Sequence, residues 1–597
     1  MRPRGPVCAA LAGALITISA DAAPQLALDV TLDPGSRRLD AVAELPAPAD
    51  AGVTLYRTLS INRVTLGGRE LRFARSGTEG DLRLWRVEAE PGAPLRIEYG
   101  GVLPGLDPQL DFRRVLRELP PMASPNGTFL GAGSGWYPRP ALPFSYRVKL
   151  SLPAGQRGLV PGRLIREVEP HGADRRYIAE FAFEHPAEDI DLMAGPYVVR
   201  EKLVAREAAE PLRLRTYFYP ELAPLAGDYL ADSARYIARY AKEIGSYPFA
   251  GFSVVASPLP VGFGMPTLTY IGSQVLRLPF IRATSLGHEV LHNWWGNGVY
   301  VDYAHGNWSE GLTTFMADYA YKEEASAEEA RATRLAWLRD FASLPAGSPQ
   351  SLAEFRTRAH GAAAAIGYGK AAFVFYMLRD LIGADAFARG VRGFWRAQRF
   401  RIASWTDLQR AFEQASGRPL GTFFAQWVER AGAPDVRIVS ARQRDGAIEV
   451  ILAQSQPAYA LRVPLEIVGE HGSETRVVQL DRARQTVTLR VSGNPTGLRL
   501  DPELRLWRVL DPAELPPILR AWILARAPRI ALASPALRAD AMALAGQLFE
   551  NRAEEIPLAE VGGGAQPVLL IGLRADVDAA LAARGLPNEP EHLAGRG

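Results

Sequence analysis

The sequence predicts a multidomain α+β protein, because two regions of alternating hydrophobicity flank a mostly helical middle. Short period-two runs, broken by Pro and Gly, fill residues 23–205 and return at 433–510, which is typical of antiparallel β domains. We expect an N-terminal antiparallel β domain in the first region and a small β-sandwich in the second. Between them, across 206–432, apolar residues recur mostly at helical spacing. The last stretch, 511–597, predicts a short α/β segment or a helical tail of unknown role.

Composition describes a core-forming protein and not a nucleic-acid binder. Hydrophobic residues make up 48% of the 597 residues and charged residues 22%, enough for three or four folded domains. The 68 basic and 65 acidic residues are interspersed and leave a net charge of +3. No basic face for nucleic acid is therefore expected. The sequence leaves the oligomeric state open.

The first residues have the pattern of a secretory signal peptide. Arg2 and Arg4 precede an apolar run from Val7 to Ala20, and small residues follow it. We expect residues 1–22 to be removed. A membrane anchor is the alternative, but the run is shorter than the roughly 20 residues that a span needs. The mature chain is thus expected to have no stable membrane span.

Cysteine usage indicates an exported bacterial protein. The single cysteine, Cys8, lies inside the expected signal peptide, so the mature chain would carry no thiol. Export without disulfides fits a periplasmic or secreted protein that is stabilised by the size of its core.

The clearest chemical signal is an HExxH motif made by His288, Glu289 and His292. Two His four residues apart stack on one face of a helix, where both imidazoles can reach one Zn²⁺ ion. Glu289 then points beside the metal. Glu310, in the run NWSEG, begins the next apolar-patterned helix and is the candidate third ligand. The alternative, a chance string on an ordinary helix, needs a rare coincidence because only 8 of 597 residues are His.

The run HEVLHNWWGN followed by NWSEG resembles the M1 family of zinc aminopeptidases, which are gluzincins. The resemblance implies one Zn²⁺ ion held by His288, His292 and Glu310 in a thermolysin-like catalytic domain at 206–432. Seventeen residues, 293–309, separate the second His from Glu310, whereas the family usually has eighteen. A one-residue deletion in the connecting loop would explain the difference.

A second stretch downstream supports the same resemblance. AIGYGKAAFVFYML is similar to the family's YxKGAxVLxML, and Tyr368 falls on the Tyr that donates a hydrogen bond to the tetrahedral intermediate. The alternative for Tyr368 is a Tyr that only packs between helices. Tyr376, on the same segment, is expected to face the core.

Upstream, VGFGMPTLTYIG stands where M1 enzymes carry the GAMEN strand, which lies along the substrate. The resemblance implies substrate binding by the residues of this strand, which are Gly262, Phe263, Gly264 and Met265.

This chain departs from the family directly after that strand. Met265 matches the family's Met, but Pro266 and Thr267 stand in the places of Glu and Asn. In M1 aminopeptidases that Glu holds the free α-ammonium of the substrate. Pro removes both an ion pair and a backbone donor. We therefore expect altered or lost dependence on a free peptide N-terminus.

Two functions follow from these residues. The first is an exported zinc metallopeptidase that acts on peptide or protein substrates with Glu289 as general base and Tyr368 as oxyanion donor. The second is a non-catalytic M1-like module for peptide binding or assembly. Pro266 and the shortened ligand spacing favour the second, and the intact HExxH and EG motifs argue against it.

Overall fold

The computed structural model describes residues 25–586 with short gaps, and the expected signal peptide with Cys8 lies outside the described residues. The described chain divides into two compact units: residues up to 293 except 239–246, and the remainder. The gaps fall at 50–51, 108–109, 111–114, 116–118, 141–142, 172–174, 207–208, 345–349, 358–363, 445, 471, 492–494, 512–513, 516–521, 523–524, 526, 549–552 and 563–566.

The first unit begins with an eight-stranded sheet in the order β13-β14-β11-β1-β2-β8-β4-β5. Its strands show the predicted alternation; in β1, Leu26, Leu28, Val30 and Leu32 are buried and the residues between them are not. β1 and β11 run parallel, and the other neighbours are antiparallel. The strands are β1 (Leu26–Asp33), β2 (Arg38–Pro46), β4 (Leu59–Leu66), β5 (Arg69–Glu70), β8 (Pro94–Val102), β11 (Phe144–Pro153), β13 (Arg163–Val168) and β14 (Arg176–Ala187).

Two smaller sheets complete the N-terminal β region. One is four-stranded and the other three-stranded, in the orders β12-β15-β10-β9 and β3-β7-β6. Their strands are β3 (Gly52–Tyr56), β6 (Phe73–Glu79), β7 (Leu82–Val87), β9 (Met122–Ser124), β10 (Gly127–Leu130), β12 (Arg157–Leu159) and β15 (Leu192–Gly195). The N-terminal β-rich region predicted from the alternation is therefore confirmed.

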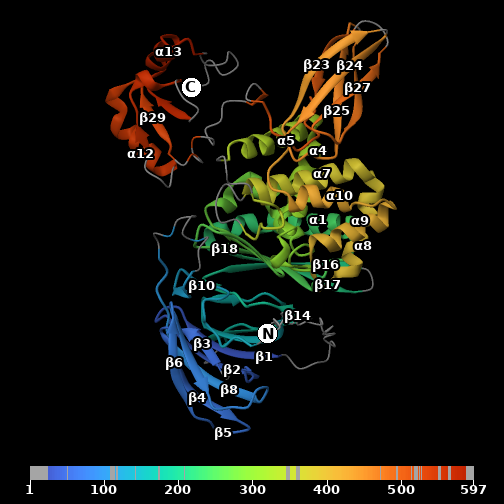
Figure 1. Ribbon diagram of the computed structural model, residues 1–597. Helices are drawn as coiled ribbons and strands as arrows, with labels where there is room; N and C mark the ends of the chain where they lie inside the picture. The colour runs from blue at the N-terminus through green and yellow to red at the C-terminus, as the bar shows by residue number, and fades with distance from the viewer. Residues whose placement is uncertain are drawn as a thin grey trace, which may run out of the picture. The chain divides into compact units, whose positions relative to one another are not determined.

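The last sheet of this unit is five-stranded, in the order β16-β17-β18-β20-β19. β16 and β17 form an antiparallel hairpin, so the boundary expected at residue 205 falls inside one supersecondary unit. β17 and β18 are parallel neighbours (Figure 1), and η2 (Pro220–Leu225) and α1 (Ala226–Glu243) lie between them in the chain. The strands are β16 (Val198–Arg206), β17 (Ala209–Phe218), β18 (Gly251–Ser257), β19 (Gly262–Met265) and β20 (Leu268–Gly272).

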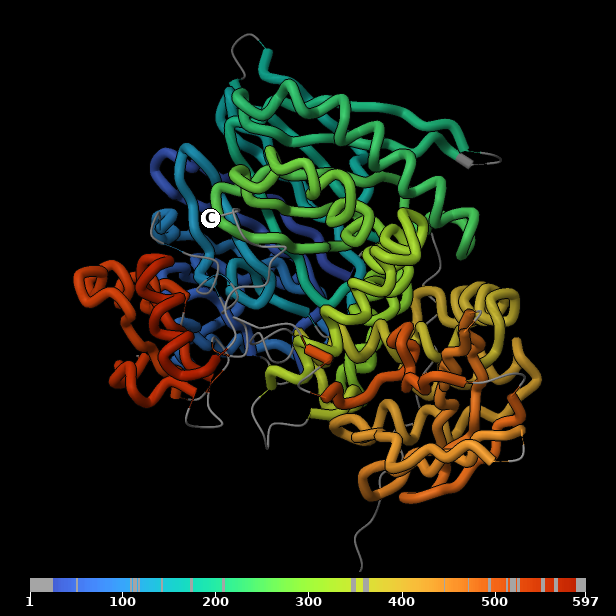
Figure 2. The backbone as a smooth tube through the Cα atoms, turned by 90° about the horizontal axis from the view of Figure 1, so that it is seen from above, coloured from blue at the N-terminus to red at the C-terminus, as the bar shows by residue number. Residues whose placement is uncertain are grey.

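The second unit opens with helices. α8 packs against both α7 and α9, and the three lie together in the yellow part of the chain (Figure 2). A capping box between Ser404 and Asp407 begins α9, and Gly417 in the left-handed conformation ends it. Tyr376 of α7 is buried, as predicted. The helices are α3 (Ser309–Thr314), η6 (Phe315–Tyr319), α4 (Ala320–Ala325), α5 (Ala327–Ala342), η7 (Ala365–Lys370), α7 (Ala371–Ile382), α8 (Ala384–Gln398), α9 (Trp405–Ser416), α10 (Gly421–Phe424) and η8 (Ala425–Glu429).

Two three-stranded antiparallel sheets follow, in the orders β23-β24-β27 and β26-β25-β28. Alternate residues of β24 and β25 are buried, which is typical of two sheets packed face to face. Their strands are β23 (Val436–Arg444), β24 (Ala447–Gln454), β25 (Leu461–Gly469), β26 (Gly472–Leu480), β27 (Arg484–Arg490) and β28 (Pro495–Leu500).

The described C-terminal residues form a small α/β segment and not a helical tail. β29 (Arg529–Leu532) pairs in parallel with β30 (Glu554–Glu555) and β31 (Val568–Ile571), and the helices α12 (Arg538–Leu548) and α13 (Arg574–Ala582) accompany them. Buried residues around Trp522 and Ile530 give this segment an apolar cluster of its own. Among the described residues, none of the helices has the length and hydropathy that crossing a bilayer requires.

Candidate metal centre

The HExxH residues lie on one continuous helical run. A π-helical turn, η4 (Ile281–Ser285), leads into α2 (Leu286–Leu291), and His292 caps its end. Leu286, Val290 and Leu291 are fully buried, whereas His288 and His292 are half-buried. The buried apolar residues fix the rotation of the helix, so both imidazoles project on the same side. Their Nε2 atoms lie 3.1 Å apart.

Glu310 joins this pair from the next helix. One ligand atom each from His288, His292 and Glu310 lies within 4.8 Å of the others, and all three side chains are half-buried. The three residues expected from the sequence to bind metal are thus brought together.

The geometry of these three residues fits zinc. Two imidazole nitrogens and one carboxylate are the His₂Glu set of catalytic zinc sites, which keep a further position open. Tetrahedral ligands at about 2.0–2.1 Å from zinc lie about 3.3 Å apart. The two Nε2 atoms, 3.1 Å apart, nearly match that spacing.

Local contacts hold Glu310 in place. Asn307 accepts hydrogen bonds at its Oδ1 from the backbone N–H and the hydroxyl of Ser309, at 3.1 and 2.9 Å, and so supports the start of α3. Gly311 lets α3 approach α7 closely, since a Cβ there would lie 2.2 Å from the Cβ of Ala371. Glu310 and Gly311 therefore combine a candidate ligand with the close helix contact that positions it.

The edge strand β19 passes directly beside Glu289. A Cβ added at Gly264 would lie 2.5 Å from Glu289 Oε2 and 3.6 Å from His292 Cδ2. Only glycine allows the backbone of β19 this close to the carboxylate. Gly262 and Gly264 are exposed on this strand, whereas Met265 is buried. The backbone around Gly262–Gly264 is thus the part of the expected substrate-binding strand open to a ligand.

Replacing Gly264 by Ala is expected to reduce kcat by up to about 10²-fold, because the new methyl group displaces the Glu289 carboxylate. The melting temperature should change little, since the clashing atom is the far end of a flexible side chain. Gly262→Ala is the matched control, because a Cβ there meets nothing within 4 Å. Equal kcat values for Gly264→Ala and Gly262→Ala on the same peptide would show that Gly264 is not needed to leave room for the Glu289 carboxylate.

The Pro266–Thr267 turn connects β19 to β20 and is hydrogen-bonded to Asn293, just after α2. Thr267 has a positive φ of 67°, which costs a β-branched residue about 1–3 kcal/mol. Its N–H donates to Asn293 Oδ1 at 2.9 Å, and its hydroxyl accepts from the Gly162 N–H at 2.8 Å. These contacts hold the strained conformation. Asn293 follows the HExxH motif directly, and our sequence analysis did not single it out.

An aromatic wall lines the other face of β19. The ring of Phe129 lies 6.0 Å from that of Phe263 and 5.3 Å from that of Tyr270, both stacked. Phe263 alternates with Gly264, so its side chain leaves the strand on the opposite face from Glu289. The candidate strand is therefore flanked by aromatic rings on that face.

Tyr368 lies on the π-helical segment η7 and is half-buried, with its ring edge-on to Phe355 at 6.3 Å. Glycines on both sides make room for aromatic neighbours: Gly367 faces the ring of Phe355 and Gly369 faces Trp337. η7 also packs against α3, the helix of Glu310. A π-helical segment is frequent at functional sites, and the role of Tyr368 in catalysis stays a prediction.

Lys370, two residues after Tyr368, is fully buried and donates to the Arg430 carbonyl at 2.8 Å. Burial, together with the charge of Arg430, lowers the pKa of Lys370 from 10.5 to about 7. Because the unfolded chain then binds more protons than the folded chain between these two values, Lys370 makes stability rise with pH across that window.

We expect wild type to gain melting temperature relative to Lys370→Met as the pH rises from about 7 to about 10. Other groups titrate in both proteins and cancel in the difference. Lys202→Met, at an exposed position of β16, should follow the wild type at every pH. If the melting temperatures of wild type and Lys370→Met changed with pH in parallel, the lowered pKa of Lys370 would be contradicted.

Comparison with known proteins finds a family model that matches the middle of the chain. Residues 282–427, which contain the HExxH motif, Glu310 and Tyr368, match the peptidase family M1 domain. Glutamyl aminopeptidase of Sus scrofa is 25% identical over 243 residues, 37% of this chain and 25% of that protein. Aminopeptidase N of Lactococcus lactis subsp. lactis is 30% identical over 116 residues, 19% of this chain and 12% of that protein. The chain spans a quarter or less of the length of these two relatives.

Solved structures share the architecture. Aminopeptidase A of Legionella pneumophila, in complex with aspartic acid, has a TM-score of 0.64 at 16% identity, over 85% of this chain and 62% of that chain. An M1 zinc metallopeptidase of Deinococcus radiodurans, bound to a Tyr-Ser-Ala substrate, has a TM-score of 0.52 at 19% identity, over 68% of this chain and 93% of that chain. The likeness confirms the predicted multidomain α+β fold.

Proposed function

We propose that this chain, an M1 aminopeptidase-like protein, is an exported zinc metallopeptidase that hydrolyses peptide bonds with one Zn²⁺ ion. The observation that carries the proposal is the convergence of His288, His292 and Glu310 beside Glu289 and the exposed strand β19. A metal, a general base and an edge strand are the parts that peptide hydrolysis needs.

The residues divide the reaction between them. Zinc, when bound, supplies Lewis acidity toward water and the scissile carbonyl. Glu289, which is outside the ligand set, accepts the proton of the attacking water and passes it to the leaving amine. The backbone of β19 pairs with an extended peptide, and Tyr368 donates a hydrogen bond to the developing oxyanion.

Specificity for a free N-terminus is proposed to be weakened or lost. Pro266 stands at the end of β19, where the resembling family has a Glu for the substrate's α-ammonium, and aromatic rings line the other face of the strand. Pro266 offers no carboxylate to pair with an α-ammonium. The relative bound to Tyr-Ser-Ala supports a peptide as the substrate class.

Hydrolysis of one peptide with a free and an N-acetylated terminus tests this specificity. We expect kcat/KM for the two forms to agree within about tenfold, which corresponds to less than 1.4 kcal/mol. Strict rejection of the acetylated peptide would show that the chain still recognises the free amine. No zinc-dependent cleavage of either form would leave the non-catalytic module as the function, and Pro266 is the residue that favours this alternative.

Export is proposed from the pattern of residues 1–22. Expression of the full chain in a bacterium should give a mature protein that begins near Pro24 in the periplasmic or secreted fraction. An uncut chain in the cytoplasmic fraction would contradict export.

A further inference from the structure

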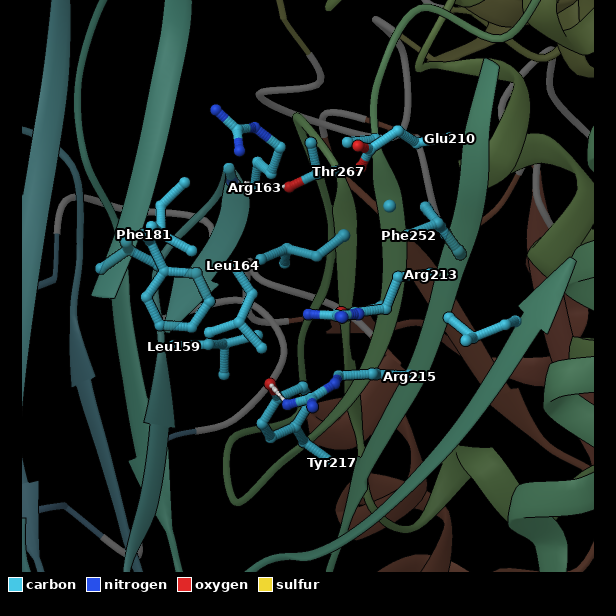
Figure 3. Close-up of a pocket in the computed structure, with 18 of the residues that line it drawn as sticks. Leu159, Arg163, Leu164, Phe181, Glu210, Arg213, Arg215, Tyr217, Phe252 and Thr267 are labelled. Atoms are coloured by element: carbon cyan, nitrogen blue, oxygen red, sulfur yellow. Dashed lines mark hydrogen bonds between the residues drawn. The ribbon is translucent and has the colours of Figure 1, made fainter. Parts of the chain in front are cut away.

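The first unit contains a cavity of about 330 Å³ whose residues have no part in the proposed peptidase chemistry, apart from Thr267 of the turn after β19. Figure 3 shows it between β17, which carries Glu210, Arg213 and Arg215, and a wall formed around Leu159 and Leu164. A volume of this size lies at the lower end for small-molecule sites, which hold about 300–1,000 Å³. The cavity therefore suits a ligand the size of one amino acid.

Two arginines of the cavity are already paired with protein carboxylates. Arg215 donates to both oxygens of Glu167, at 2.7 and 3.0 Å, and to Glu201 at 2.7 Å. Its side chain is only 10% exposed. Arg163, on the opposite side, donates to Glu184. These two guanidinium groups are committed to protein carboxylates and serve as part of the wall.

Arg213 differs from both. It lies two residues before Arg215 on the same face of β17, and its side chain is 41% exposed. The Glu201 carboxylate lies 3.6 Å from its Nε, which makes an ion pair but is too far for a hydrogen bond. Within the described part of the chain its guanidinium makes no hydrogen bond. Its planar fork is therefore available for a ligand carboxylate.

Glu210 provides the opposite charge. Its carboxylate makes no hydrogen bond or ion pair with any residue that the structure describes. Glu210 lies three residues before Arg213 near the start of β17, and both residues line the same cavity (Figure 3). A simple anion would meet repulsion from Glu210, and a simple cation would meet repulsion from Arg213.

Part of the wall is apolar. It includes buried side chains from four different strands and one less buried neighbour on β13. These are Leu159, Phe181, Phe252, Leu268 and Leu164. Such a wall favours burial of an aliphatic or aromatic side chain.

We propose that this cavity binds a free apolar α-amino acid in its zwitterionic form. Arg213 holds the carboxylate, Glu210 holds the ammonium, and the side chain packs on the wall around Leu159 and Phe181. A peptide has its two termini on different residues, so only a single amino acid presents both charges next to one apolar group. Free amino acids are also products of complete peptide hydrolysis, but binding in this cavity requires no peptidase activity.

Titration of L-leucine into the full mature chain after removal of metal with a chelator tests the proposal by calorimetry. The metal-free protein is used because the metal centre could itself bind an amino acid. We expect one binding site. Arg213→Gln and Glu210→Gln should each weaken binding about tenfold or more, as expected for loss of a charged hydrogen-bonding group. Arg200→Gln, at an exposed arginine of β16 outside the cavity, should leave it unchanged.

Two leucine analogues test separately what the carboxylate and the ammonium of the ligand contribute to binding. Leucinamide lacks the carboxylate and 4-methylpentanoate lacks the ammonium, and each should bind about tenfold more weakly than leucine or worse. Circular dichroism verifies that the variants are folded. Absence of leucine binding by the folded metal-free chain, equal binding by Arg213→Gln, or equal binding of either analogue would overturn the proposal. These measurements need no turnover, so their failure is distinct from a failure of the proposed peptidase function.

Discussion

Replacing Glu289 by Gln is expected to lower kcat by about 10²–10⁴-fold while zinc stays bound. Gln keeps the shape of Glu but cannot accept the proton of the attacking water. The metal should remain because the three ligand atoms come from His288, His292 and Glu310. Turnover of a peptide and metal content, measured on the same preparation, test both halves of this result.

Glu328→Gln is the matched control for that experiment, since Glu328 is exposed on α5. It should match the wild type in kcat and in zinc content. Cleavage that Glu289→Gln leaves unchanged would show that another group acts as the base. Loss of zinc from the variant would instead make Glu289 part of the metal site.

Replacing Glu310 by Ala is expected to remove both zinc and activity. Loss of a residue that only supports a ligand costs about 10–100-fold in metal affinity, and loss of a ligand should cost more. This variant is the sharper test of the site, because Glu310 is the ligand whose spacing differs from the resembling family. Zinc per chain after dialysis against buffer, measured by atomic emission, should fall from about one to well below one.

A comparison with His292→Ala makes the outcome specific. Each variant removes one side chain of the same three-residue cluster, so both should lose zinc to a similar degree. Full zinc retention by Glu310→Ala together with loss from His292→Ala would mean that another residue supplies the third ligand.

Local patterns in the sequence were sufficient for the fold class, and they singled out the three residues, His288, His292 and Glu310, that the structure brings together. Where one face of a strand is buried, apolar and polar residues alternate in the sequence, and this alternation predicts the strand, as β1 shows. The spacing of His288 and His292 places both imidazoles on one side of a helix whatever surrounds it. The boundary at residue 205 was misplaced because the same alternation continues through the β16–β17 hairpin into a different sheet.

The contacts that position the chemistry were not predictable in this way. Gly264 and Glu289 are far apart in the chain, as are Thr267 and Asn293, and no local pattern reports that they touch. Thr267 also adopts a backbone conformation that its own preference opposes, because hydrogen bonds from Gly162 and to Asn293 outweigh the local cost. The parallel pairing of β1 with β11 is likewise set by the whole sheet.

The Pro266–Thr267 turn also limits how this protein can change. It fixes the pairing of Gly264 with Thr269 and of Met265 with Leu268. Because side chains alternate along a strand, an insertion of one residue in the turn would exchange the two faces of β19. Phe263 or Met265 would then point at Glu289 where glycine now leaves room. The turn can therefore vary in the identity of its residues, as Pro266 already shows, but its length cannot change by one residue without placing a side chain against Glu289.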